Sequence, residues 1–229
     1  MKSKPPIPEE RRTRTVVIDD HPFFREGLVG WLNSQAGLVC CGEASSVEEG
    51  REAISKADPD LVLLDLQLKT GDGLELLTEL MARKCRSAVI VLSRKDEDIY
   101  ASRAIRAGAR GYVMKEEAPE TLLAAIRAVL DGRIYVGSNA MTKMVERMSG
   151  DGGQGPQDAL LELSNRELQV LDLLGRGLTT KSIAAELSVS TKTVDSYRES
   201  LKKKLGLADG NALIRAATIW HQEMRPPGE

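Results

Sequence analysis

The sequence of 229 residues lacks most features of the specialised protein classes. No apolar run approaches the roughly 20 residues that a membrane helix needs. Residues 1–13 lack the apolar core of a signal peptide. The three cysteines show no CxxC or Cys/His ligand spacing, so neither a metal site nor a redox role is indicated for them. These absences favour an ordinary soluble protein with a cytoplasmic location.

A strong charge of either sign is also absent. The net charge is −2 for the whole chain, −3 for residues 1–158 and +1 for residues 159–229. This contrast is only weak evidence for nucleic-acid binding. However, a basic cluster in the second part can neutralise phosphates locally even when the average charge is near zero. The cluster consists of Arg198, Lys202, Lys203 and Lys204.

Four short apolar runs each end on a polar residue. The runs are 15–18, 61–64, 88–92 and 112–114, and the residues that follow them are Asp19 and Asp20, Asp65, Ser93 and Lys115. Such runs are typical of strands that are buried on both faces, and the carboxyl ends of parallel strands meet at one edge of a sheet. We therefore expect three carboxyls, a hydroxyl and an ammonium to converge on a phosphoryl-transfer site.

Strand and helix patterns alternate before residue 150. The expected strands are 15–19, 38–44, 61–65, 88–93 and 111–115, and the expected helices are 22–34, 46–56, 73–84, 97–107 and 119–130. Five βα units predict an α/β fold with a doubly wound, five-stranded parallel sheet. A short helix at 139–148 and a glycine-rich linker at 150–157 follow.

The pattern after the linker is helical only, which predicts a second, all-α domain. Ser164 and Glu167 have the spacing of a capping box and open a helix to about Leu174, which Gly175 and Gly177 close.

A helix, a tight turn and another helix follow at 180–187, 188–190 and 191–205. The last helix has a buried stripe at spacings of three and four, formed by Val194, Tyr197, Leu201 and Leu205. Its opposite face either enters the major groove of DNA or is merely solvated. The expected DNA-binding residues are Lys192, Thr193, Asp195, Ser196, Arg198, Glu199, Lys202 and Lys203.

Motifs in both parts resemble one known family. VIDDHPFFREGL, LVLLDLQL, GDGLEL, VLS and GYVMK occur in family order, and LSNRELQVLDLLGRGLTTKSIAAELSVSTKTVDSYRESLKKKL follows them. The first part resembles the flavodoxin-like receiver domain of two-component response regulators, and the second resembles the LuxR-type helix-turn-helix. Together they resemble the NarL/FixJ subfamily. The resemblance implies a disordered tail (1–13), a receiver (14–133), a linker with a short helix (134–159) and a DNA-binding domain (160–224).

The resemblance also implies residue roles. A sensor histidine kinase would phosphorylate Asp65, and Ser93 and Lys115 would bind the phosphate oxygens. Ser93 and Tyr112 would form the switch, although Tyr112 also fits a half-buried strand tyrosine. The expected ligands of Mg²⁺ are Asp19, Asp20, Asp65 and the main-chain carbonyl of Gln67. Three close carboxylates need such a cation to remain ionised together. The other expected partners are double-stranded DNA and, after phosphorylation, a second copy of the chain, with no membrane involved.

Three positions leave questions open. Lys69 stands where most receivers have proline, and Arg94 follows Ser93 where they usually have a small residue. The Arg94 side chain either restricts access to the site or points to solvent. His21 either helps to cap a helix or transfers protons.

These features predict a phosphorylation-switched, DNA-binding transcription regulator, which is not an enzyme beyond phosphoryl acceptance on its own Asp65. One alternative is an aspartyl-phosphate phosphatase that acts on small molecules. The sequence has no DxD arrangement around Asp65 and no inserted substrate-binding segment, which argues against it. The other is a phosphorylation-independent DNA-binding regulator whose receiver is an interaction module. The intact acidic residues, Ser93 and Lys115 disfavour that alternative.

Overall fold

The computed structural model describes residues 12–68, 70–94, 97–148, 159–160 and 163–223, and these residues form two compact units. The first unit takes its residues from Met1–Arg94 and Ala104–Val136, and the second from Lys95–Arg103 and Gly137–Glu229. The expected receiver range 14–133 differs from the first unit at 95–103, which group with the second unit, and at 134–136, which the first unit includes. The glycine-rich linker, Lys69 and residues 1–11 of the expected tail lie outside the described residues.

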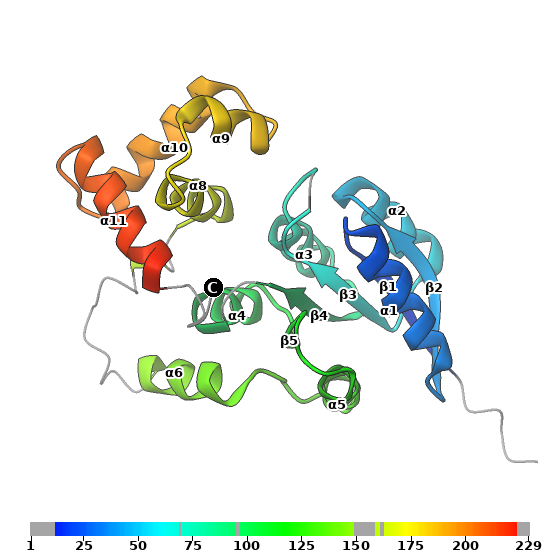
Figure 1. Ribbon diagram of the computed structural model, residues 1–229. Coiled ribbons are helices and arrows are strands. Elements are labelled where there is room, and N and C mark those ends of the chain that lie inside the picture. The colour runs from blue at the N-terminus through cyan, green and yellow to red at the C-terminus, as the bar shows by residue number, and fades with distance from the viewer. Residues whose placement is uncertain (1–11, 69, 95–96, 149–158, 161–162, 224–229) are drawn as a thin grey trace, which may run out of the picture. The chain divides into compact units, whose positions relative to one another are not determined.

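The first unit contains a five-stranded parallel sheet with the order β2-β1-β3-β4-β5 (Figure 1). The strands are β1 (Thr13–Ile18), β2 (Leu38–Ala44), β3 (Leu61–Asp65), β4 (Ala88–Ser93) and β5 (Gly111–Met114). The predicted α/β fold with a doubly wound sheet is confirmed. The strand β1 begins at Thr13 because its amide donates to the carbonyl of Gly37 at 2.7 Å. Thr13 is therefore part of the sheet and not of the expected tail.

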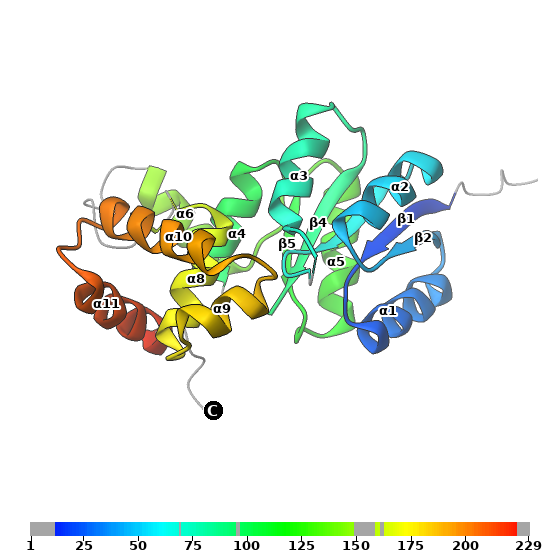
Figure 2. The same cartoon turned by 90° about the horizontal axis from the view of Figure 1, so that it is seen from above.

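Helices cover both faces of this sheet. In Figure 2, α1 and α5 lie on one face, and α2 and α3 lie on the other. The helices of this unit are α1 (Pro22–Ser34), α2 (Val47–Ala57), α3 (Gly73–Ala82) and α5 (Pro119–Leu130), together with the end of α4 (Glu97–Arg106). One buried apolar cluster joins the strands to α1 and α5 through residues such as Leu32 and Ile126. This packing fixes the start of α1 close to the carboxyl edge of the sheet.

The second unit is helical in its described part. Besides the beginning of α4, it contains α6 (Ser138–Met148), α8 (Asn165–Gly175), α9 (Thr180–Glu186), α10 (Thr191–Lys204) and α11 (Gly210–Glu223). The predicted capping box is confirmed, because the side chains of Ser164 and Glu167 each accept a hydrogen bond from the other residue's backbone amide. Gly177 and Gly206 follow α8 and α10 with positive φ, as helix ends favour.

The helix α11 is an element that the sequence pattern did not lead us to expect. Asp209 accepts a hydrogen bond from the amide of Ala212 at 2.7 Å and so caps its start. Buried Leu213, Ala217 and Trp220 give it an apolar face. A Cβ on Gly175 would lie 2.3 Å from the carbonyl oxygen of Ala217, so α8 and α11 pack closely only because residue 175 is glycine. None of the described helices has both the length and the apolar character that crossing a membrane requires.

Candidate functional site

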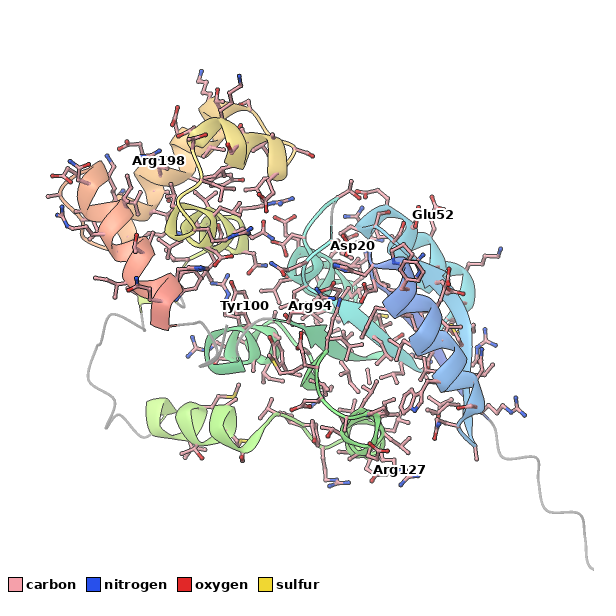
Figure 3. The ribbon with its side chains drawn as sticks, viewed as in Figure 1. Asp20, Glu52, Arg94, Tyr100, Arg127 and Arg198 are labelled. Atoms are coloured by element: carbon pink, nitrogen blue, oxygen red, sulfur yellow. The ribbon has the colours of Figure 1, made fainter. Side chains whose placement is uncertain are left out.

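Five polar residues lie at the carboxyl edge of the sheet. Asp19 and Asp20 directly follow β1, Asp65 ends β3, Ser93 ends β4 and Lys115 directly follows β5 (Figure 3, where Asp20 is labelled). The three aspartates are 1%, 8% and 2% exposed, and Ser93 is fully buried. The amide of Lys115 donates to the carbonyl oxygen of Ser93 at 2.8 Å, which joins the ends of β4 and β5.

Lys115 supplies a buried positive charge to this cluster. Its Nζ lies 2.7 Å from Asp19 Oδ2 and 2.6 Å from Asp65 Oδ2, and its side chain is 3% exposed. Burial raises the pKa of Asp65 to about 6, although the Lys115 ammonium and a hydrogen bond from the Gln67 amide act to lower it. Asp65 is therefore mostly ionised at neutral pH and is available as a nucleophile.

The donor atoms of the cluster suit a hard divalent cation. Ligand atoms of Asp19, Asp20, His21 and Asp65 all lie within 4.8 Å of one another. The three carboxylates outnumber the Lys115 ammonium, so a buried excess of negative charge remains. A divalent cation would offset this excess, and carboxylate oxygens are ligands that Mg²⁺ accepts. The residues present therefore fit magnesium.

His21 is at the N-cap position of α1, but its side chain makes no capping hydrogen bond. Its Nδ1 lies 2.8 Å from Asp20 Oδ1 and 3.3 Å from Asp19 Oδ1. The capping interpretation is thus right for the position of His21 in the chain and wrong for its side chain. The imidazole lies against the acidic cluster instead.

The structure also bears on the open questions about Tyr112 and Arg94. Tyr112 is completely buried, so its hydroxyl does not extend into water. The Arg94 side chain is 58% exposed, and its Nε lies 3.9 Å from Glu116 Oε1, whose side chain is 60% exposed. This exposure supports the alternative in which Arg94 points to solvent.

In the second unit, α9 and α10 form the expected helix-turn-helix. Ser188 has a φ of 53° in the turn, and the Ser190 side chain caps α10 by accepting from the amide of Thr193 at 3.0 Å. Val194 and Leu201 are buried, whereas Tyr197 and Leu205 are only partly buried. The exposed residues on the other side of α10 include Lys192, Asp195, Ser196, Glu199 and Lys203.

Three members of the basic cluster already have partners within this unit. Arg198 Nη1 donates to Thr180 Oγ1 at 2.8 Å and joins α10 to the start of α9 (Figure 3). Lys202 Nζ lies 2.9 Å from Glu199 Oε1, and Lys204 Nζ lies 2.7 Å from Glu167 Oε2. Lys203 is exposed on the outer face of α10. The basic groups are therefore not equally available for phosphates.

Comparisons with known proteins agree with both parts of this geometry. The family model described as "Response regulator receiver domain" matches residues 15–127, and "Bacterial regulatory proteins, luxR family" matches residues 161–217. The DNA-binding transcriptional activator DevR/DosR of Mycobacterium tuberculosis is 34% identical over 94% of this chain and 98% of its own length. The chain belongs to the NarL/FixJ subfamily of response regulators.

Two further proteins are similar to this response regulator over most of its length. The oxygen regulatory protein NreC of Staphylococcus aureus is 31% identical and covers 89% of this chain and 96% of its own. Among solved structures, RcsB of Salmonella enterica serovar Typhimurium, bound to a promoter in the presence of a phosphomimetic, is 25% identical with a TM-score of 0.62. It covers 90% of this chain and 98% of its own.

Several residues that shape the receiver site of this response regulator were not indicated by its strand pattern. Arg25 donates to the carbonyl oxygen of Asp19, and its Nε lies 3.5 Å from Glu43 Oε2. A Cβ on Gly73 would lie 2.2 Å from the carbonyl oxygen of Asp65. Asp72, which precedes Gly73, caps α3 by accepting from the amide of Leu74 at 2.8 Å. Only the last feature, an acid before a helical pattern, could have been found from the sequence.

Proposed function

We propose that this response regulator is a phosphorylation-switched, DNA-binding transcription regulator that accepts a phosphoryl group on Asp65 from a sensor histidine kinase. The observation that carries the proposal is the buried Lys115 ammonium, which lies 2.6 Å from Asp65 in a cluster with two further carboxylates. An ionised nucleophile beside a fixed positive charge suits phosphoryl transfer, in which positioning and charge stabilisation contribute most.

In the proposed reaction, an oxygen of the Asp65 carboxylate attacks the phosphorus of a phosphohistidine. The oxygen–phosphorus bond forms while the phosphorus–nitrogen bond of the donor breaks, and the departing imidazole takes its proton from water. The Lys115 ammonium and the Ser93 hydroxyl then donate to phosphoryl oxygens. Bound Mg²⁺ would neutralise charge on the incoming group, and its proposed ligands are Asp19, Asp20, Asp65 and the main-chain carbonyl of Gln67.

Ser93 and Tyr112 are proposed as the switch because both are fully buried on paired strands. Movement of the Ser93 hydroxyl toward the phosphate would change the space into which the Tyr112 ring of β5 can pack. The switched output is DNA binding through α10, as the RcsB structure with its promoter supports. We propose a homodimer in the phosphorylated state, because paired helix-turn-helix units reach two half-sites. The same proposal includes a cytoplasmic location and no reaction beyond acceptance on Asp65.

The direct test is intact mass spectrometry after incubation with Mg²⁺ and acetyl phosphate. The wild type should gain one phosphate, and Asp65→Asn should gain none, because the amide is nearly isosteric but is not a nucleophile. Asp131→Asn, at an exposed site in the same unit, should behave like the wild type. Equal labelling of Asp65→Asn and the wild type would refute the site. Release of free phosphate without modified protein would indicate a phosphatase instead.

A further inference from the structure

The Lys115 ammonium has an aromatic neighbour besides its two carboxylates. Its Nζ lies 4.8 Å from the centre of the Phe24 ring, within the range of a cation–π interaction. A lysine ammonium has three N–H donors, and Asp19 and Asp65 each lie within hydrogen-bond distance of Nζ. The negative face of the Phe24 ring therefore adds a further favourable contact for this nearly desolvated charge.

Phe24 is held firmly enough for this role. It lies in the first turn of α1, two residues after Pro22, whose fixed φ preorganises the start of the helix. Its ring is partly buried and packs against the apolar cluster between α1, α5 and the sheet. The adjacent residue Phe23, by contrast, is 91% exposed. The two phenylalanines thus form a matched pair, in which Phe24 has its ring beside the Lys115 ammonium and Phe23 is exposed.

The apolar surroundings of the Phe24 ring strengthen its attraction for the Lys115 ammonium. A groove of about 320 Å³ adjoins both residues, and most of its lining is apolar, including Leu28, Trp31 and Leu122. Apart from Lys115 itself and Glu117, no residue that lines the groove has a charged side chain. Cation–π attraction is stronger where the cation is desolvated, as Lys115 is with a side chain that is 3% exposed.

We propose that Phe24 is a positioning residue for phosphoryl transfer, because its ring holds the Lys115 ammonium at the edge of the sheet beside Asp65. An aromatic ring stabilises a cation without carrying a negative charge of its own. Unlike a further carboxylate, it therefore does not repel the incoming phosphoryl group. This inference rests on the proposed function, since the positioned ammonium acts on the phosphoryl group that Asp65 accepts.

The chain contains only two phenylalanines, which allows a sharp experiment. In the Phe23→Leu variant, biosynthetic incorporation of fluorinated phenylalanines changes the ring of Phe24 alone. Successive fluorine atoms weaken the negative face of the ring and largely preserve its shape. The rate constant for phosphorylation by acetyl phosphate with Mg²⁺ should fall stepwise, by about threefold to tenfold for the fully fluorinated ring. A rate constant that stays the same across the series would overturn the proposal.

Variants separate the electrostatic role from a simple loss of packing. Phe24→Tyr and Phe24→Trp should retain most of the phosphorylation rate, because their rings also attract cations. Phe24→Leu should lose as much as the fluorinated series, whereas Phe23→Leu should match the wild type. If Phe24→Leu reacted as fast as Phe24→Tyr, the ring would have no electrostatic role and the proposal would be wrong.

An NMR measurement tests the contact without any phosphorylation. The ε-methylene signal of Lys115, assigned as the one missing from Lys115→Arg, should be shifted by the ring current in the wild type and in Phe23→Leu. The shift should disappear in Phe24→Leu. Its absence from the wild type would overturn the inference and leave the proposed function standing. If the shift is present but neither the wild type nor any variant is phosphorylated, the proposed function is wrong. The proposed role of Phe24 in phosphoryl transfer is then wrong as well.

Discussion

At the scale of single residues, Glu167 shows how one buried charge joins two helices of the DNA-binding unit. The residue is 4% exposed, and its Oε2 accepts from the Ser164 amide at 2.5 Å. Its Oε1 accepts from Ser200 Oγ at 2.5 Å, and Lys204 Nζ lies 2.7 Å from Oε2. Burial alone would raise the pKa of Glu167, but these hydrogen bonds outweigh it and lower the pKa to about 2.

The lowered pKa of Glu167 predicts how the stability of this unit depends on pH. Because the folded pKa lies below the unfolded one, the contribution is complete above about pH 4.5 and is lost as the pH falls toward 2. A shift of this size corresponds to about 3 kcal/mol of unfolding free energy. Glu167→Gln should therefore lower stability at pH 7 and flatten its dependence on pH between 4.5 and 2.

Urea unfolding at a series of pH values measures this effect. The chain has two tryptophans, Trp31 in α1 and Trp220 in α11, so the Trp31→Phe background reports on the DNA-binding unit alone. Glu199→Gln is the control, because Glu199 lies on α10 with a side chain that is 73% exposed. If the two variants showed the same pH dependence, the buried contacts of Glu167 would not be the cause.

At the scale of elements, Gly73 at the start of α3 lies very close to the backbone of Asp65, the proposed phosphoacceptor. The amide of Gly73 donates to the carbonyl of Leu66 at 3.2 Å, and residue 73 approaches Asp65 so closely that no side chain fits there. The first residue of α3 is therefore in close contact with the backbone of Asp65.

Gly73→Ala should destabilise the receiver unit by about 1 to 3 kcal/mol, because the added methyl group must displace backbone atoms. The same variant should weaken the proposed binding of Mg²⁺ at Asp65. The control is Gly30→Ala in α1, where a Cβ has nothing within 4 Å and alanine favours the helix by roughly 1 kcal/mol. Urea unfolding followed by Trp31 fluorescence in the Trp220→Phe background compares the two. A Gly73→Ala variant as stable as the wild type would show that the loop relaxes freely.

The helix α10 should bind DNA through two separable sets of residues. Lys203→Ala should weaken binding to all sequences alike and lower the salt dependence of the binding constant by about one unit. Asp195→Ala should instead change which sequence is preferred, by roughly 1–3 kcal/mol if Asp195 pairs with cytosine. Selection from random duplexes with each variant tests both statements. Identical preferred sites for the wild type and Asp195→Ala would show that Asp195 reads no base.

The strand ends of the receiver could be predicted from the sequence, because burial on both faces leaves an apolar run with a clear stop. Parallel topology then brings Asp19, Asp65 and Lys115 together, whatever their separation in the chain. The contacts of Phe24 with Lys115 could not be predicted in this way. They depend on the rotation of α1 about its axis, which tertiary packing sets.

The DNA-binding unit shows the same limit. The capping box at Ser164 is a local signal and was found, whereas the pairing of Glu167 with Lys204 joins residues that are distant in the sequence. The helix α11 was missed even though its buried residues, Leu213, Ala217 and Trp220, have helical spacing. The packing of α11 against α8 explains why these buried residues have helical spacing.

At the scale of the whole molecule, the proposed switch is an energetic coupling between Asp65 and DNA affinity. A shift from 1:99 to 99:1 between two states needs roughly 5.5 kcal/mol of differential stabilisation. In the proposed switch, a phosphoryl group on Asp65 would add a new negative charge at this site, and Lys115, Ser93 and a bound Mg²⁺ would interact with it. The coupling must disappear when Asp65 cannot be phosphorylated.

The most direct test measures DNA affinity before and after phosphorylation by acetyl phosphate and Mg²⁺, using duplexes selected from a random pool by the phosphorylated wild type. We predict that phosphorylation tightens binding of the wild type by at least about tenfold, equivalent to 1.4 kcal/mol. The affinity of Asp65→Asn should not change with the same treatment. Equal affinities for the phosphorylated and unphosphorylated wild type would contradict a phosphorylation-switched regulator.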